Sequence, residues 1–232
     1  GFCVGAEGLA VSAPICVLLN EIERAVQEKA GWIVKKLQET RERHKRLEAV
    51  RIDWKDGATL PFLGGLLTVV LDPRQSVSAM MVQPVSAVAD AVDGAKGLPP
   101  TDERNTLCLG LAHSATATQI RDAAQAWLMR YARQLFEQRL NHFAPELGVQ
   151  WRRLSLSSAG TRWGSASADG SIRLNWRLIH FKLPVIDYVV VHELSHLRVM
   201  DHSPRFWDTV RHVVPDYAEL RSQLKDEMVP KW

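Results

Sequence analysis

The stretch DYVVVHELSHLRVMDHSPRFW, residues 187–207, places three histidines and a glutamate directly beside a run of valines. His192 and His196 are four residues apart, so on a helix they lie on one face, about 6 Å apart along the axis. Two imidazole nitrogens at that separation can bind one ion with Zn–N distances of about 2.0–2.1 Å. The apolar run indicates a buried helix, and a metal ion would compensate for burying these polar side chains. The stretch therefore predicts a zinc site on a buried helix.

A catalytic zinc normally has three protein ligands and leaves its fourth position to water. We predict His202 as the third ligand, because the chain can turn back toward the ion in the loop that follows the helix. Glu193 projects about 100° from His192, so it can act as general base without binding the ion. Three other residues stay open as ligands: Asp201, Asp208 and His212. Asp208 could instead orient a histidine by a hydrogen bond.

The HExxH motif by itself arises by chance in on the order of one chain in a hundred of this length. Without a metal, His192 and His196 would be partly buried helix residues with hydrogen-bonded partners, and Glu193 a solvated charge. A second alternative is a non-catalytic module with a structural zinc. That site would be closed by a fourth protein ligand.

The composition is that of a globular protein: 232 residues, 46% hydrophobic and 24% charged. No apolar run approaches the ~18 residues that a membrane span needs, and we expect no secretory signal. Cys3, Cys16 and Cys108 form no CxxC pair and favour a reducing, cytoplasmic setting. The formal net charge of +3 is too small to imply nucleic-acid binding.

We predict two parts, a β-rich part with a long helix over 1–111 and a helix–sheet–helix part over 112–232 that carries the metal motif. The first part is expected to contain a hairpin over 2–13, helices over 15–50 that break at Gly31, and strands within 54–71 and 106–111. Residues 72–105 are rich in glycine, proline and small residues, which predicts a loop or excursion with a possible strand at 76–83. The second part is expected to contain a helix over 118–143 closed by Pro145 and Gly148, three strands within 149–179, and the buried helix.

Two long blocks resemble the YgjP-like zinc metallopeptidase family, which is related to the SprT-like proteases: TRWGSASADGSIRLNWRLI, residues 161–179, and VIDYVVVHELSHLRVMDHSPRFWDTVRHVVPDY, residues 185–217. Weaker likeness covers residues 29–37 and 56–71. The resemblance implies His192, His196 and His202 as zinc ligands and Glu193 as the catalytic glutamate. It also implies an α+β zincin-like core, a sheet plus the active-site helix, whose edge strand holds an extended protein or peptide substrate. The family commonly has Cys at the position of Ala166, and Cys or Ala at that of Ser195; neither position is a ligand.

Four residues before the helix are candidates for substrate binding. Arg162, Trp163 and Gly164 form either a substrate-facing strand or a turn with a packed tryptophan. Asn175 could contact the substrate backbone. Tyr217 could stabilise an oxyanion, although a packing role is favoured.

The basic segment KKLQETRERHKRLEAVR, residues 35–51, raises the alternative of a DNA-associated protease that acts on DNA-bound proteins. Contact with DNA would involve Lys35, Lys36, Arg43 and Arg46. The interspersed glutamates favour a solvated helix face with ion pairs instead. The sequence leaves the oligomeric state open.

Overall fold

The structure, a computed structural model, describes residues 1–5, 8–14, 16–49, 51–75, 79–82, 105–226, 229–230 and 232. Two compact units are described separately: Gly1–Arg51, and Ile52–Pro230 together with Trp232. The predicted division near residue 111 falls inside the second unit and stays a prediction. In the described part of the chain, no helix is both long and apolar enough to cross a membrane.

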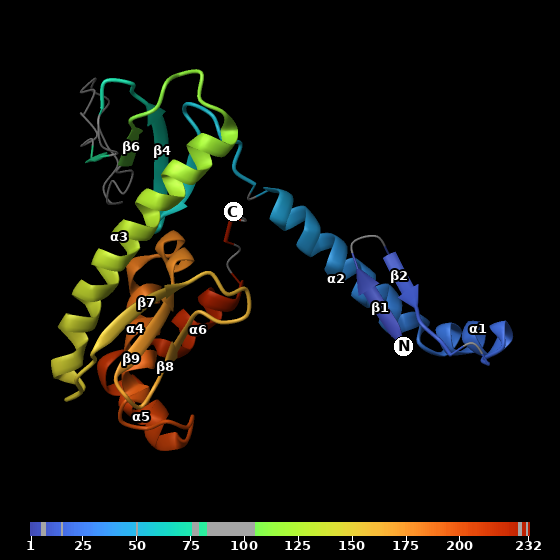
Figure 1. Ribbon diagram of the computed structural model, residues 1–232. Coiled ribbons are helices and arrows are strands. Elements are labelled where there is room, and N and C mark those ends of the chain that lie inside the picture. The colour runs from blue at the N-terminus through green and yellow to red at the C-terminus, as the bar shows by residue number, and fades with distance from the viewer. Residues whose placement is uncertain are drawn as a thin grey trace, which may run out of the picture. The chain divides into compact units, whose positions relative to one another are not determined.

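The first unit is a hairpin followed by two helices (Figure 1). β1 (Phe2–Gly5) pairs antiparallel with β2 (Gly8–Val11), which confirms the predicted hairpin. α1 (Leu19–Glu28) and α2 (Ala30–Ala49) confirm the predicted helices. The break between them lies at Lys29, two residues before the predicted position at Gly31.

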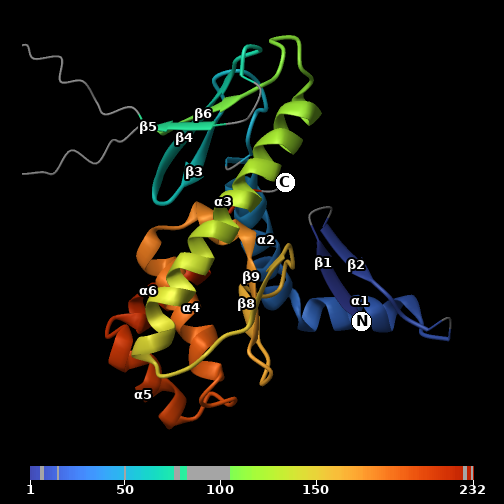
Figure 2. The same cartoon turned by 60° about the vertical axis from the view of Figure 1, so that its left-hand side comes forward.

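The second unit begins with a four-stranded sheet in the order β3-β4-β6-β5 (Figure 2). Its strands are β3 (Thr59–Phe62), β4 (Gly65–Leu71), β5 (Ala79–Val82) and β6 (Asn105–Leu109). Leu63 and Gly64 have positive φ values of 50° and 85°, as a tight hairpin turn between β3 and β4 requires. β4 and β6 run parallel, so the intervening chain returns to the same end of the sheet. β5 confirms the strand expected near 76–83, and the rest of the predicted excursion lies outside the described residues, except for 72–75.

α3 (Ala117–Glu146) is the longest helix of the described chain. Its N-terminus is capped by Thr116, whose hydroxyl accepts from the backbone N–H of Gln119 at 3.3 Å. Pro145 was predicted to close the helix, and this was wrong: the proline lies inside the last turn, and the helix ends at Glu146. The backbone N–H of Leu147 still reaches the carbonyl of Phe143 at 3.1 Å, so this end stays hydrogen-bonded beyond the proline.

A second sheet has the order β7-β9-β8, which leaves β8 at an edge. β7 (Arg153–Ser157) and β9 (Ser171–Asn175) are parallel, and β8 (Gly164–Ala166) pairs antiparallel with β9. The positive φ of 86° at Gly170 confirms the predicted turn at Asp169-Gly170. A short helix, η1 (Trp176–His180), then leads into α4 (Leu183–His196), which lies behind this sheet in Figure 1. α5 (Pro204–Val213) and α6 (Tyr217–Asp226) follow.

Alternation along the strands decides which face of the second sheet is buried. Leu154, Ile172 and Leu174 point into the core, whereas Arg153 and Arg173 are exposed. Buried hydrophobic side chains from both sheets and from α3 to α6 belong to one cluster. The second unit is therefore an α+β fold, in which a sheet covers the helix that carries the HExxH motif.

Candidate metal centre

The buried helix α4 positions the first candidate ligands. Pro184 lies in its first turn, where the missing N–H of proline is tolerated, and the valines 189–191 are buried. His192 and His196 follow one helical turn apart, with ring centroids 4.9 Å from each other. Both imidazoles are partly buried, because most residues of the helix from Val185 to Ser195 are buried.

His202 joins the two helix histidines from the turn between α4 and α5. Its Nε2 lies 3.2 Å from Nε2 of His192. One nitrogen from each ring lies within 4.8 Å of the others, so the three can converge on one ion. The ring of Phe206 packs against all three imidazoles, with centroids 4.5–4.9 Å away. The phenyl ring is thus an apolar contact that all three imidazoles share, and it restricts their orientations.

The electrostatics of the three rings fit a bound cation. Burial and the neighbouring histidines lower the pKa of His192 to about 3, and burial lowers the pKa of His196. Both imidazoles are therefore neutral at neutral pH, the form that binds metal. Nδ1 of His196 lies 3.2 Å from the carbonyl oxygen of Val199, which suits an N–H donor and leaves Nε2 free as a ligand. Nδ1 of His192 is buried and has no hydrogen-bond partner among the described residues.

The side chain of Glu193 is buried beside this cluster, with 5% of its surface exposed. Burial raises its pKa to about 8, and no described basic side chain forms an ion pair with it. The carboxylate abuts the backbone of Gly164 in the edge strand. A Cβ at Gly164 would lie 2.7 Å from both Cγ and Cδ of Glu193, so only glycine fits there without a shift. The helix and the edge strand therefore meet at the carboxylate.

The three alternative ligands lie apart from the cluster. Asp201 accepts a hydrogen bond from the backbone N–H of Ser203 at 3.0 Å. Asp208 is exposed and pairs with Arg211 at 3.1 Å. Among the described residues, the group that can hold an ion consists of His192, His196 and His202, with none of Asp201, Asp208 and His212. Which of these six residues bind an ion stays a prediction.

The candidate substrate-binding residues occupy β8, β9 and the loop between β7 and β8. Trp163 packs edge-on against Phe181, with centroids 5.0 Å apart. Asn175 is only 3% exposed, and its amide group is occupied within the protein. It donates to the carbonyl of Ala159 at 2.8 Å and accepts from the N–H of Arg177 at 3.1 Å. Asn175 thus holds the loop that precedes β8; substrate binding by Arg162, Trp163, Gly164 and Asn175 stays a prediction.

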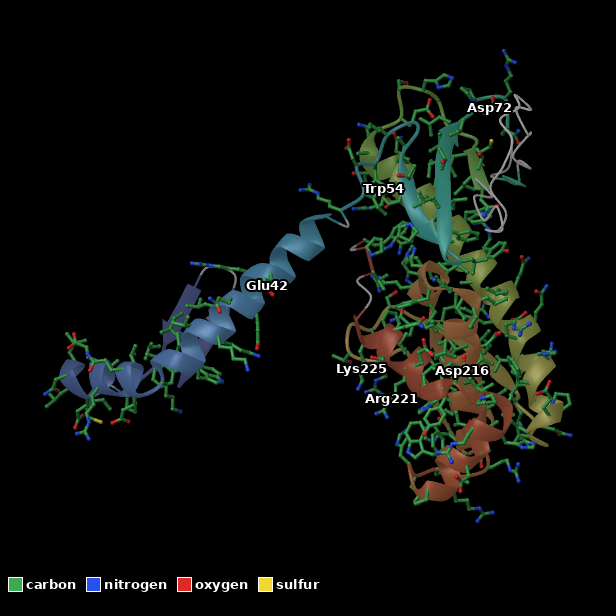
Figure 3. The ribbon with its side chains drawn as sticks, turned by 180° about the vertical axis from the view of Figure 1, so that it is seen from behind. Glu42, Trp54, Asp72, Asp216, Arg221 and Lys225 are labelled. Atoms are coloured by element: carbon green, nitrogen blue, oxygen red, sulfur yellow. The ribbon has the colours of Figure 1, made fainter. Side chains whose placement is uncertain are left out.

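Aromatic and basic side chains from α4, α5 and α6 lie near the cluster. The indole of Trp207 stacks on His202 at 5.8 Å and on Tyr217 at 5.1 Å. Arg221, which projects from α6 (Figure 3), lies over the Trp207 ring at 5.0 Å from its centroid. Tyr188 is buried one turn before His192, with ring centroids 5.9 Å apart. The stacking of Tyr217 agrees with the packing role favoured from the sequence, and its other possible role stays a prediction.

A buried helix with three converging imidazoles and a glutamate, beside the edge of a sheet, is typical of a metal-dependent peptidase. The model of the YgjP-like metallopeptidase domain matches residues 2–227. The chain therefore belongs to the YgjP-like metallopeptidase family, as the sequence blocks at 161–179 and 185–217 had indicated. A peptidase acts on proteins or peptides, and this class of substrate follows from the family.

Comparison with curated proteins found no match. Among solved structures, the chain is similar to the metallopeptidase zymogen of Pyrococcus abyssi abylysin, with 25% identity and a TM-score of 0.36 over 41% of this chain and 99% of that one. The metallopeptidase zymogen of Methanocaldococcus jannaschii jannalysin has 20% identity and a TM-score of 0.34, over 39% of this chain and 95% of that one.

Proposed function

We propose that the chain is a zinc-dependent endopeptidase whose active site is the cluster on α4. His192, His196 and His202 would hold the ion, since their nitrogens lie within 4.8 Å of one another and two of the rings are neutral. Bound zinc would supply Lewis acidity, which makes water acidic near neutral pH and polarises the scissile carbonyl. Zinc is one of the divalent metals that imidazole ligands bind well.

Glu193 would act as the general base. Its carboxylate would take the proton of the attacking water as the new C–O bond forms, and would pass that proton to the amine as the C–N bond breaks. The apolar surroundings of Glu193 favour this role, because a carboxyl with a pKa near the working pH can both accept and release a proton. The free edge of β8 would hold the substrate as an added strand, which places its backbone beside the carboxylate.

One observation carries the proposal: three imidazoles face one another beside a buried glutamate that touches the edge strand. A structural zinc would need a fourth protein ligand, and the described residues offer none at the cluster. The test is to purify the protein without chelator, measure bound zinc, and follow cleavage of an unfolded protein. Glu193→Gln should keep about one zinc per chain and lose cleavage, while Glu219→Gln, at an exposed site on α6, should keep both. Cleavage by Glu193→Gln would remove Glu193 as the base.

No specific observation favours the DNA-associated alternative. Lys36 pairs with Glu39 at 2.9 Å, as a solvated helix face would, and the side chains of Arg43 and Arg46 lie outside those described. A cytoplasmic location stays a prediction. The three cysteines carry free thiols, and two of them, Cys3 and Cys16, are exposed, which suits a reducing setting.

A further inference from the structure

The open face of the second sheet carries arginine and serine side chains close to Glu193. In β8, Gly164 and Ala166 pair with the inward-facing Leu174 and Ile172, whereas Ser165 pairs with Arg173. Alternation therefore places Ser165 and Arg173 on the outer face, opposite the buried helix. Ser157, at the end of β7, shares this face, since it lies an even number of residues from the exposed Arg153. The sheet thus turns its apolar side to the catalytic helix and a polar, basic side to solvent.

A small hollow lies on this outer face, beside the edge strand. It is lined by Ser157, Arg162, Trp163, Gly164, Ser165 and Arg173, and its volume is about 10 Å³. That volume holds about one water-sized group, so the hollow admits the tip of a side chain and no more. Two of the lining residues are serines and two are arginines. The residues at the hollow therefore include hydrogen-bond donors of the kind that an anionic group requires.

Both arginines at the hollow keep unused hydrogen-bonding capacity. Nε of Arg173 makes a long contact of 3.4 Å with the Ser155 hydroxyl, and the exposed Arg162 uses only its backbone carbonyl, which accepts from Asn175. Within the described ranges, neither guanidinium forms an ion pair with a carboxylate. Asp169, in the turn between β8 and β9, is hydrogen-bonded to Ser171. Two uncompensated positive charges thus flank the hollow.

We propose that Arg162 and Arg173, with Ser157 and Ser165, form a subsite for an acidic side chain of the substrate. This inference rests on the proposed function, in which a substrate strand pairs with the free edge of β8. Such a strand would lie about 4.8 Å from β8, and the short side chain of Ser165 leaves room for arginine to reach across. The planar guanidinium donates two parallel hydrogen bonds to a carboxylate, which makes arginine selective for Asp and Glu. Because Gly164 touches Glu193, the acidic residue lies within one or two positions of the scissile bond.

Pairs of peptides that differ only by Glu or Gln near the scissile bond test the subsite. For the zinc-loaded wild type we expect kcat/KM to be about tenfold higher for the Glu peptide, as one charge-assisted hydrogen bond would give. Arg173→Gln and Arg162→Gln should each remove most of this preference, because kcat/KM for the Glu peptide should fall toward the value for the Gln peptide. Arg153→Gln is the matched control, because Arg153 lies on the same face of the sheet but outside the hollow; it should keep the preference. Added salt should weaken the preference.

A binding measurement separates this inference from the proposed function. With fluorescently labelled peptides, the Glu193→Gln variant should bind the Glu peptide more tightly than the Gln peptide. The double variant Glu193→Gln, Arg173→Gln should bind both with equal affinity. Equal rates and equal affinities for the two peptides would overturn the acidic subsite and leave the peptidase standing. Selective binding with no cleavage by the wild type would support the subsite and overturn the proposed reaction.

Discussion

Gly164 and Glu193 are in direct contact, although one lies in an edge strand and the other in a buried helix. A side chain at Gly164 would begin 2.7 Å from Cγ and Cδ of the glutamate. The contact joins the strand expected to hold the substrate to the carboxylate expected to move the proton. We therefore expect the absence of a Cβ atom at Gly164 to determine how close a bound substrate lies to Glu193.

Gly164→Ala should therefore impair catalysis while metal binding persists. The new methyl group must displace the Glu193 carboxylate or the β8 backbone, and a misplacement of about 1 Å can cost about 100-fold in rate. We expect kcat to fall by about that factor, with zinc content and the far-UV spectrum unchanged. Gly160→Ala is the control, because a Cβ at Gly160 meets no atom within 4 Å. Full activity of Gly164→Ala would show that the close contact is not needed.

His202→Ala should weaken zinc binding more than the roughly 10–100-fold that the loss of an outer-shell partner costs, because a ligand itself is removed. Competition with a chromogenic chelator measures the affinity. His212→Ala should bind zinc as the wild type does, since His212 lies outside the converging group. Equal affinities for the two variants would mean that the third ligand is another residue.

The stability of the metal-free protein should decline as the pH rises from about 6.5 to about 8. Burial raises the pKa of Glu193 to about 8 from a usual value near 4.5, so over this range the unfolded chain is ionised and the folded chain holds a proton. Stability conferred by the protonated carboxyl is complete below pH 4.5 and is lost as the pH rises through the folded-state pKa. Chelator-treated protein, followed by urea unfolding at several pH values, would show the decline. It should vanish in Glu193→Gln and remain in Glu219→Gln.

The same metal-free protein should also lose stability in acid. The pKa of His192 is lowered to about 3 by burial and by the neighbouring histidines. Between the usual value of 6.5 and about 3, the unfolded state binds a proton that the folded state excludes, so stability falls as the pH falls through this range. Between pH 4.5 and 6.5, the stability lost through His192 as the pH falls opposes the stability gained through Glu193. His192→Gln should therefore make the acid side of the urea-unfolding profile less steep. An unchanged profile would contradict a buried neutral ring.

Asp187→Asn should lower the free energy of unfolding by about 2 kcal/mol. Asp187 in α4 accepts two hydrogen bonds from Arg139 in α3, at 2.6 and 2.9 Å, and the two side chains are 16% and 24% exposed. The effect should stay below the ~3–5 kcal/mol of a fully buried pair because both groups keep some contact with solvent. The exposed pair of Arg121 and Asp122 gives the control, and Asp122→Asn should cost less than about 1 kcal/mol. Equal costs for the two variants in urea unfolding would show that burial adds nothing.

The sequence was most informative where function restricts local spacing. The four-residue separation of His192 and His196 predicted a shared helix face, and the turn after the helix predicted the approach of His202; the structure brings all three together. The hairpin turn at Asp169-Gly170 was also predictable from local sequence, because its positive φ favours glycine. Each of these features depends on a few neighbouring residues.

Contacts between distant segments were not predictable in this way. From the sequence, Gly164 suggested a bulge. Its contact with Glu193 could not be predicted, because that contact depends on the packing of β8 against α4. Asn175 suggested a substrate contact, yet its amide is engaged by the loop before β8, which only the fold reveals. The sequence could not show that Trp207 stacks on Tyr217 of the next helix, and Pro145 suggested a helix end although the helix continues past it.

The edge strand β8 is only three residues long and begins with glycine. So short an edge exposes few unpaired amides and carbonyls, and it is a poor template for the open strand of another folded molecule. We therefore do not expect two copies of the chain to pair through this edge, which stays accessible to other chains. A chain that pairs with it must bring an extended, flexible segment, so intact globular domains should resist digestion until they are locally unfolded.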